Sequence, residues 1–328
     1  MFRVPLRGLM LAALCVWASS ACAGDKKDDL NDPTKVDADF AVQGEYAGEL
    51  AQEGGKQKTG VQVIARGGGK FHAVLFPGGL PGDGWEKGPR EEADGQTQEG
   101  VTAFTTPKWT AKIKDGGMTV ADAAGKELGQ LKRVIRESPT LGAKPPEGAV
   151  VLFDGTTAEN FQNGRMTEDK LLKEGVTSKQ KFQNHTVHLE FRLAYMPTAS
   201  GQGRSNSGCY LQGRYEVQIL DSFGLPLKDN ECGGIYSVGA PRIEMCFPPL
   251  SWQTYDIDFT AAVYEGAKKV KSARVTVRHN GVLIHEDREA DHSTTASQQG
   301  EGASAGPLYL QDHGNPVRFR NIWVVERK

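Results

Sequence analysis

Short runs in which hydrophobic and polar residues alternate dominate the second half of the chain. The clearest is Val187–Arg192, whose hydrophobic residues fall on one side of an extended strand and whose polar residues fall on the other. Tyr255–Phe259 alternates in the same way, and Asn280-Gly281 is a typical hairpin turn between two further runs. One short helix is expected over Thr167–Glu174. Strands without intervening helices predict antiparallel sheets packed as a sandwich or jelly roll.

A series of strand-like runs separated by Gly-rich breaks precedes this region. The runs are Tyr46–Leu50, Gly60–Ile64, Phe71–Leu75, Thr102–Thr105, Trp109–Ile113, Met118–Ala121 and Leu128–Ile135. The stretch Pro77–Gly95 is rich in Gly, Pro and charge, so we expect a loop there. These patterns predict a small β-domain over 41–137. A Pro-rich connector at 138–147 then leads to a second domain at 148–328.

The beginning of the chain has the features of an export signal. Two arginines, Arg3 and Arg7, precede the apolar run Gly8–Ala18, which is too short to span a bilayer. The pattern predicts a signal peptide at 1–23 and a charged linker at 24–40, so we expect an exported protein, periplasmic or on the cell surface. Cleavage before Gly24 would release a soluble protein. Cleavage before Cys22 would leave that residue for lipid attachment and membrane anchoring, and the sequence leaves both routes open.

Composition narrows the function classes. The 328 residues include 39 Lys+Arg and 41 Asp+Glu, and the formal net charge of -2 argues against a nucleic-acid binder, which needs a basic face. The 40 glycines favour many turns and short strands. Three cysteines follow the signal: Cys209, Cys232 and Cys246. A Cys232–Cys246 disulfide closing a short loop and free buried thiols both remain open.

Polar side chains of mixed charge gather on several predicted strands and at their ends. They are His188, Glu190 and Arg192; Arg204, Asn206, Arg214, Glu216, Gln218 and Asp221; and Gln311, His313 and Asn315. Amide, imidazole and guanidinium groups form directional hydrogen bonds, and such faces are typical of the wet, concave floor of a sugar-binding site. A solvated outer face is the alternative for any single residue. Trp252 could stack on a sugar ring or lie in the core, whereas His185 and His188 are expected at the surface.

A set of motifs follows a fixed order in the second domain. The motifs are Val150–Gly155, Arg204–Gly208, Tyr215–Ser222, Trp252–Tyr255, Leu310–Gly314 and Phe319–Ile322. In this order they resemble the 3-keto-disaccharide hydrolase family, also described as 3-keto-glucoside lyase/hydratase, over about residues 147–328. The resemblance implies an all-β, concanavalin-like jelly-roll sandwich. The preceding β-domain is similar to the leading domain of exported planctomycete members.

The spacing of carboxylates bears on the chemistry. Laminarinase-like enzymes carry Glu-x-Asp-x-x-Glu on one strand, and here the same spacing is Glu216-x-Gln218-x-x-Asp221. Gln218 cannot act as an acid or base, and Asp221 reaches the face of Glu216 only through a β-bulge. Retaining hydrolysis needs two carboxyl groups about 5 Å apart, so this departure weakens direct hydrolysis.

The resemblance implies another reaction, on a glycoside carrying a ketone at C3. A base removes the C2 proton, the glycosidic oxygen leaves C1, and water can add back. Such a site needs a base, an electrophile for the enolate oxygen and a proton donor for the leaving group. His313, Glu216 or Glu190 could be the base. Arg204, Arg214 or a hard divalent ion could hold the enolate; Ca²⁺, Mn²⁺ or Mg²⁺ would suit such ligands, although no dense metal motif is present.

We therefore predict an enzyme that acts on a carbohydrate and keeps its site residues in one pocket. The catalytic candidates are Glu216, His313 and Asp221. The candidates for substrate contacts are Glu190, Arg204, Asn206, Arg214, Gln218 and Gln311. The alternatives are a non-catalytic, lectin-like surface module and a structural or interaction domain, because fold alone does not fix function.

Overall fold

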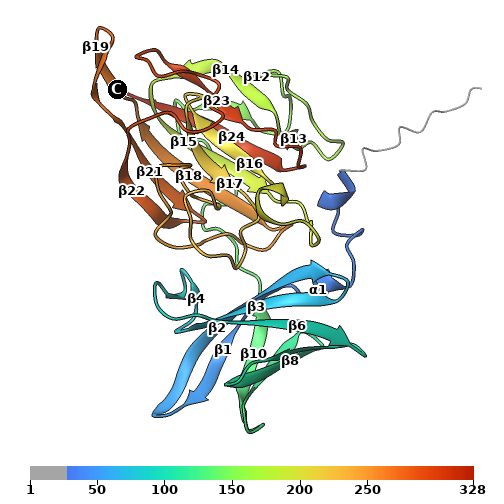
Figure 1. Cartoon of the computed structure of the whole chain (residues 1–328). Coiled ribbons are helices and arrows are strands. Elements are labelled where there is room, and N and C mark those ends of the chain that lie inside the picture. Colours follow the sequence, from blue (N-terminus) through green and yellow to red (C-terminus); the bar gives the residue numbers. More distant parts are fainter. Residues whose placement is uncertain (1–27) are drawn as a thin grey trace, which may run out of the picture.

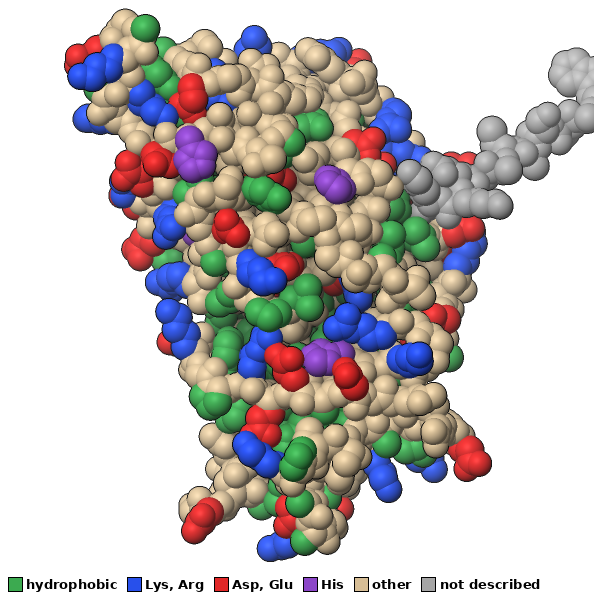
Figure 2. Space-filling model, in the orientation of Figure 1, with side chains coloured by type: hydrophobic (Ala, Val, Ile, Leu, Met, Phe, Trp, Pro, Cys, Tyr) green, Lys and Arg blue, Asp and Glu red, His purple; other side chains and the backbone are tan. Residues whose placement is uncertain are grey.

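The computed structural model describes residues 28–328, so the expected signal peptide and Cys22 lie outside the described residues. The described chain forms a closed β-barrel followed by a sandwich of two sheets (Figure 1). This confirms the predicted all-β fold class, a jelly-roll sandwich preceded by a small β-domain. Among the described residues no helix is long and apolar enough to cross a membrane. Figure 2 shows acidic and basic side chains interspersed over one face of the molecule.

Eight antiparallel strands close the barrel in the order β1-β10-β9-β8-β7-β6-β3-β2. They are β1 (Gly44–Gln52), β2 (Gly55–Gly67), β3 (Lys70–Pro77), β6 (Glu91–Gln98), β7 (Val101–Thr105), β8 (Trp109–Lys114), β9 (Gly117–Asp122) and β10 (Glu127–Val134). Each run expected to be a strand lies in one of them, except that β10 ends at Val134, one residue before the expected end at Ile135. The expected loop Pro77–Gly95 contains the short strands β4 (Leu80–Pro81) and β5 (Gly84–Trp85) and the first half of β6. Sequence alone missed β6 because its polar residues face solvent in alternation with few buried ones.

The sandwich consists of a seven-stranded and a five-stranded sheet. The larger sheet contains β11 (Val150–Phe153), β13 (Leu172–Lys173), β15 (Asn184–Arg192), β18 (Trp252–Thr260), β21 (Ala273–His279), β22 (Val282–Ala290) and β24 (Arg318–Arg327). The smaller contains β12 (Phe161–Gln162), β14 (Val176–Phe182), β16 (Ser207–Leu211), β17 (Tyr215–Ile219) and β23 (Gly306–Leu310). The hairpin β19 (Val263–Glu265) and β20 (Lys268–Lys271) forms a separate two-stranded sheet.

Alternation along the strands builds the sandwich core. Val187, Leu189 and Phe191 of β15 are fully buried in a cluster that also contains residues from both sheets. The predicted hairpin turn is present between β21 and β22, where Asn280 and Gly281 have φ of 50° and 79°, the left-handed values that a type I′ turn requires.

The expected helix over Thr167–Glu174 is wrong. The segment makes a turn and then the short strand β13, with hydrogen bonds from Thr167 N to Leu171 O and from Lys170 N to Thr167 O. Lys170 has φ of 62°, and a left-handed residue at this point interrupts a right-handed helix.

The segment expected as a charged linker is packed from residue 28 onward. It contains a 3-10 helix, η1 (Asp28–Asn31), and the single-turn helix α1 (Asp39–Val42). Asn31 Nδ2 donates to Pro316 O at 2.6 Å in the sandwich, and Gly69 N in the barrel donates to Asp39 Oδ2 at 2.9 Å. This N-terminal strap therefore connects the two domains through polar contacts at each end.

The barrel also packs directly against the sandwich. Ile64, Val74 and Phe76 lie in the same hydrophobic cluster as the sandwich core. A Cβ on Gly224 would come within 2.5 Å of Ile64, so glycine is needed where the loop after β17 meets the barrel. The domain junction thus reaches the loop that continues from the strand carrying Glu216.

Candidate active site

Glu216 lies on the outer face of the five-stranded sheet. Its neighbours Tyr215 and Val217 point into the core, so strand alternation turns the carboxyl outward. The pairing of β16 with β17 is regular and sets Tyr210 opposite Glu216. Although it lies on an outer face, Glu216 is only 2% exposed. A buried carboxyl with no cationic partner among residues 28–328 is the central feature of this face.

The hydroxyl of Tyr210 connects this carboxyl to its surroundings. It lies 2.8 Å from Glu216 Oε2 and 2.9 Å from the carbonyl oxygen of Thr295, and it accepts a hydrogen bond from Gln311 Nε2 at 3.1 Å. A tyrosine hydroxyl has one proton to donate. An ionised Glu216 and the Thr295 carbonyl would compete for it, whereas a protonated Glu216 can donate to Tyr210, which then donates to Thr295. When the acid is ionised, the Tyr210 hydroxyl can donate to Glu216 Oε2 instead, and this hydrogen bond then stabilises the carboxylate.

Burial acts on the pKa of Glu216 in the opposite direction from this hydrogen bond. Burial raises the pKa of Glu216 from its ordinary value to about 8, against an opposing contribution from the Tyr210 hydrogen bond. Burial disfavours a charged carboxylate when no cation compensates it. At pH 7 the side chain is therefore mostly a neutral carboxylic acid that can donate a proton.

A glycine makes room for this acid. Gly208 lies on β16, and a Cβ built there would come 2.1 Å from Glu216 Oε1. Glu216 therefore lies over the bare backbone of the neighbouring strand. A side chain at position 208 would collide with Glu216, which explains the glycine at the end of the sequence motif Arg204–Gly208.

Amide side chains continue the face beside the acid. Gln218 Nε2 donates to Gln202 Oε1 at 3.1 Å, and Asn206 Nδ2 donates to the same oxygen at 3.0 Å. Asn206 is 1% exposed, and its Oδ1 has no hydrogen-bond partner among the described residues. The structure thus brings Asn206, Gln218 and Glu216 onto one side of the sheet. An unpaired acceptor of this kind suits a hydroxyl donor from a ligand.

Asp221 and Arg204 pair with each other instead of lining the same face. Arg204 Nε donates to Asp221 Oδ2 at 2.6 Å, and both residues are buried, at 3% and 2% exposure. The regular register of β17 contains no bulge that would turn Asp221 toward Glu216. Asp221 is therefore an anchor of the loop after β17, because its carboxylate is paired with Arg204.

Arg214 has a structural role as well. Its guanidinium donates to Gly300 O at 2.7 Å and to Ser304 O at 3.0 Å, so it holds the loop of residues 291–305. Thr294 from this loop accepts a hydrogen bond from Glu216 N at 2.9 Å. The guanidinium of Arg214 is committed to loop carbonyls, and its contribution to the site is to hold the loop that covers Glu216.

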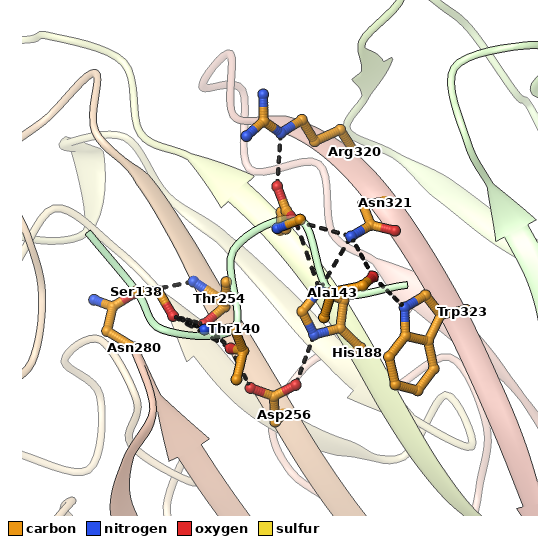
Figure 3. A network of polar contacts seen from close by, with 12 residues as sticks. Ser138, Thr140, Ala143, His188, Thr254, Asp256, Asn280, Arg320, Asn321 and Trp323 are labelled. Carbon is orange, nitrogen blue, oxygen red and sulfur yellow. Dashed lines mark hydrogen bonds and ion pairs between the residues drawn. The ribbon is translucent and has the colours of Figure 1, made fainter. Parts of the chain in front are cut away.

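Glu190 lies on the opposite outer face of the sandwich. It belongs to β15 in the seven-stranded sheet. Figure 3 shows the connector, with Ala143, passing over His188 of the same strand. It accepts hydrogen bonds from Gly142 N and Arg320 Nε, both at 2.6 Å. His188 from the same strand is fully buried beside it, and His185 is 1% exposed, so the expectation that both histidines are at the surface is wrong. The polar stripe of β15 holds the connector and does not join the face of Glu216.

Two tyrosines that the sequence did not single out lie beside the Tyr210–Glu216 pair. Tyr210 stacks near Tyr309, with ring centroids 5.3 Å apart, and Tyr309 is partly exposed. Tyr236 N donates to Glu216 O at 3.2 Å from the loop after β17. His313 is exposed two residues beyond Gln311. The regular Gly-x-Tyr and Glu-x-Gln alternation of β16 and β17 was the signal that could have identified Tyr210.

The donor set around Glu216 does not fit a divalent metal. Its neighbours are a phenol and amides, and the described residues contain no group of three or more His, Cys, Asp or Glu arranged to hold an ion. Hard divalent ions prefer several oxygen ligands, with carboxylates prominent.

A cavity of about 470 Å³ lies elsewhere, between the N-terminal strap and the ends of β15 and β24. Arg192 lines it and also lies over the ring of Trp252, at 5.0 Å, while Arg320 covers that ring at 4.0 Å. Trp252 is thus enclosed by two guanidinium groups rather than open for stacking on a sugar.

Comparisons with known proteins identify the sandwich. A sequence model described as the 3-keto-alpha-glucoside-1,2-lyase-like domain matches residues 148–325. A crystal structure of a protein from Parabacteroides distasonis ATCC 8503, provisionally assigned as a glycosyl hydrolase, is 32% identical with a TM-score of 0.51, covering 56% of this chain and 85% of that one. The GH43 BlXynB protein from Bacillus licheniformis is 9% identical with a TM-score of 0.30, covering 86% of this chain and 65% of that one; nothing below rests on it. No curated protein matches the chain.

Proposed function

The chain belongs to the 3-keto-alpha-glucoside-1,2-lyase-like domain family, and from this premise we propose that it cleaves 3-keto-glycosides with Glu216 as the proton donor. The coarser assignment, a glycosidase-type carbohydrate-active enzyme, follows from the family and from the related structure. The observation that supports the finer one is the nearly complete burial of the Glu216 carboxyl, which raises its pKa to about 8. A buried acid with a raised pKa is suited to protonate a departing glycosidic oxygen at neutral pH.

The proposed reaction is an elimination. A base removes the proton at C2, which the C3 ketone acidifies, and the electron pair forms an enolate. That pair then makes the C1=C2 double bond as the C1–oxygen bond breaks and its electrons leave with the glycosidic oxygen. Glu216 gives its proton to that oxygen, so the aglycone leaves as an alcohol and the acid becomes a carboxylate. Addition of water across the new double bond would then give net hydrolysis. His313, which is exposed two residues beyond the Gln311 that donates to Tyr210, is our candidate for the base, because a neutral Glu216 cannot accept the C2 proton.

Access to Glu216 is controlled by the loop of residues 291–305. Thr294 and Thr295 contact Glu216 and Tyr210, and the carboxyl is almost completely buried. Direct proton transfer needs a heavy-atom distance of about 2.6–3.2 Å. A substrate therefore has to move this loop, or the partly exposed Tyr309 and Tyr236 beside it, before it reaches the acid.

The test compares a 3-keto-disaccharide with its unoxidised parent, each incubated with and without a chelator. We expect turnover of the keto substrate only, and a fall of about 10²–10⁴-fold in Glu216→Gln, the usual contribution of acid–base catalysis. Glu265→Gln makes the same change at an exposed residue of β19 and serves as the matched control. Binding of the sugar without turnover by the wild type would instead identify a lectin-like module. Wild-type rates in Glu216→Gln would contradict the proton-donor role.

We also propose that the protein acts outside the cytoplasm. The support is the sequence of the first residues, with two arginines before the apolar run Gly8–Ala18. Mass spectrometry of the native protein tests this. A start at Gly24 or a diacylated Cys22 supports export and selects between the two routes, whereas an intact N-terminus in the cytosolic fraction contradicts it.

A further inference from the structure

Two buried cysteines meet beneath the loop that flanks Glu216. Cys232 and Cys246 are 1% and 0% exposed, and their thiols interact with each other. Both also point to one backbone carbonyl, that of Leu220, with Cys246 Sγ at 3.6 Å from its oxygen. The third cysteine among the described residues, Cys209, has no hydrogen bond to either thiol. The structure thus selects one pair from the three thiols.

The backbone at both positions is already fixed. Cys232 N donates to Ser222 Oγ at 2.9 Å, and Cys246 N donates to Glu244 Oε1 at 2.7 Å. Both cysteines belong to one hydrophobic cluster, which also contains Ile235 from the segment between them. The two ends of this segment are therefore held inside the core of the folded protein.

We propose that Cys232 and Cys246 form a disulfide when the protein folds in the presence of a disulfide oxidant. In the step, one thiolate attacks the oxidant's disulfide and releases one reduced thiol. The second cysteine displaces the other half, so two protons and two electrons leave the protein and one S–S bond forms. The proposal does not depend on the catalytic function.

The bond would close a loop next to the candidate acid. Ile235 within the loop bridges to Val217, and Tyr236 N donates to Glu216 O. A disulfide limits the unfolded chain and so stabilises the folded one, more strongly for longer loops. Both thiols are shielded from solvent in the folded protein, so the oxidation should take place during folding and be slow afterwards.

In the experiment, the purified protein is refolded with oxidised glutathione. The remaining thiols are blocked with an alkylating agent, and the product is digested with trypsin. The expected product is a cross-link between the peptides 229–242 and 243–268, which separate on reduction. Recovery of both peptides singly alkylated would overturn the proposal, and so would a link from either of them to the peptide that contains Cys209.

Thermal unfolding gives a second readout. Reduction of the oxidised wild type should lower the melting temperature by about 5–10 °C, as expected for a loop of this length in a domain of this size. Cys232→Ser should show no response to the reductant, whereas Cys209→Ser should keep it. A response that persists in Cys232→Ser would overturn the proposal. If that variant does not fold, the peptide map of the wild type still decides.

Discussion

The hydroxyl of Tyr210 lies 2.8 Å from the carboxyl of Glu216 on the adjacent strand, within a face that offers the acid no cation. This one contact limits how far burial raises the pKa of Glu216, because the hydrogen bond stabilises the carboxylate. The pair therefore sets the pH range in which Glu216 can act as a proton donor.

Replacing Tyr210 by Phe should move the alkaline limb of the pH–rate profile upward. Activity that depends on a protonated Glu216 is expected to fall as pH rises through its pKa of about 8. Without the hydroxyl, the carboxylate loses its stabilising donor and the pKa rises further. We expect the limb to shift to higher pH and kcat to fall about tenfold from the lost hydrogen bond.

The matched control for this change is Tyr309→Phe. Tyr309 packs beside Tyr210 but its hydroxyl does not hydrogen-bond to Glu216. We expect its alkaline limb to stay near that of the wild type. An alkaline limb that moves to lower pH in Tyr210→Phe would contradict the assignment of Glu216 as the proton donor and of Tyr210 as the donor that stabilises its carboxylate.

Gly208→Ala should impair catalysis more than it impairs stability. The new methyl group would stand 2.1 Å from Glu216 Oε1, and the flexible end of the glutamate has to move away. A displacement of about 1 Å can cost about 10²-fold in rate. We expect a loss of that order in kcat with a nearly unchanged melting temperature, measured beside Gly117→Ala, where the nearest atom lies 3.8 Å away. Equal activity in both variants would show that the position of Glu216 is not critical.

The sequence predicted the faces of the strands but not the sheets to which they belong. The alternation in Val187–Arg192 correctly separated core from outer residues, and the same rule turned Glu216 and Gln218 outward. Glu190 and Glu216 appeared equivalent because each stands on a polar face. The sandwich has two outer faces, and only long-range pairing assigns β15 to one sheet and β17 to the other.

Local sequence patterns also did not predict which polar residues are buried. Arg204 and Asp221 are polar neighbours of the site in sequence, yet they form a buried ion pair at 2.6 Å. His188 is covered by the connector, which lies about 45 residues earlier in the chain. Such coverage depends on contacts between distant segments, and a period of two residues carries no information about them.

Arg136→Met should destabilise the junction between the two domains. The guanidinium pairs with Glu45 at 2.5 Å and lies 4.9 Å from the ring centre of Phe247, and Glu45 is only 1% exposed. Removing the cation leaves a buried carboxylate without compensation, which costs about 3 kcal/mol in comparable pairs. Denaturant unfolding measures this loss. The double variant with Glu45→Gln should recover part of the stability, and additive losses would contradict a direct coupling.

Strand β15 carries, beneath the connector, a pair of titrating groups with opposite pH behaviour. Burial alone would raise the pKa of Glu190, but hydrogen bonds from His188, Asn321, Arg320 and Gly142 N outweigh it and lower the pKa to about 2. Burial alone would lower the pKa of His188, but Asp256, at 2.6 Å, and Glu190 raise it above its ordinary value. Both groups are therefore charged in the folded protein at mildly acidic pH.

Stability from this pair should be greatest between about pH 4.5 and 6.5. Glu190 stabilises the fold above its unfolded pKa, and this contribution is lost as pH falls toward 2; a shift of this size corresponds to about 3 kcal/mol. The contribution of His188 is complete below its unfolded pKa and is lost as pH rises through its raised folded pKa.

Unfolding free energies measured from pH 2 to 9 test both the acid and the alkaline loss of stability. Glu190→Gln should lose less stability than the wild type between pH 4.5 and 2, and His188→Gln should differ least from the wild type at the alkaline end. Parallel curves for wild type and Glu190→Gln in the acid range would show that Glu190 is not held as a carboxylate by the connector.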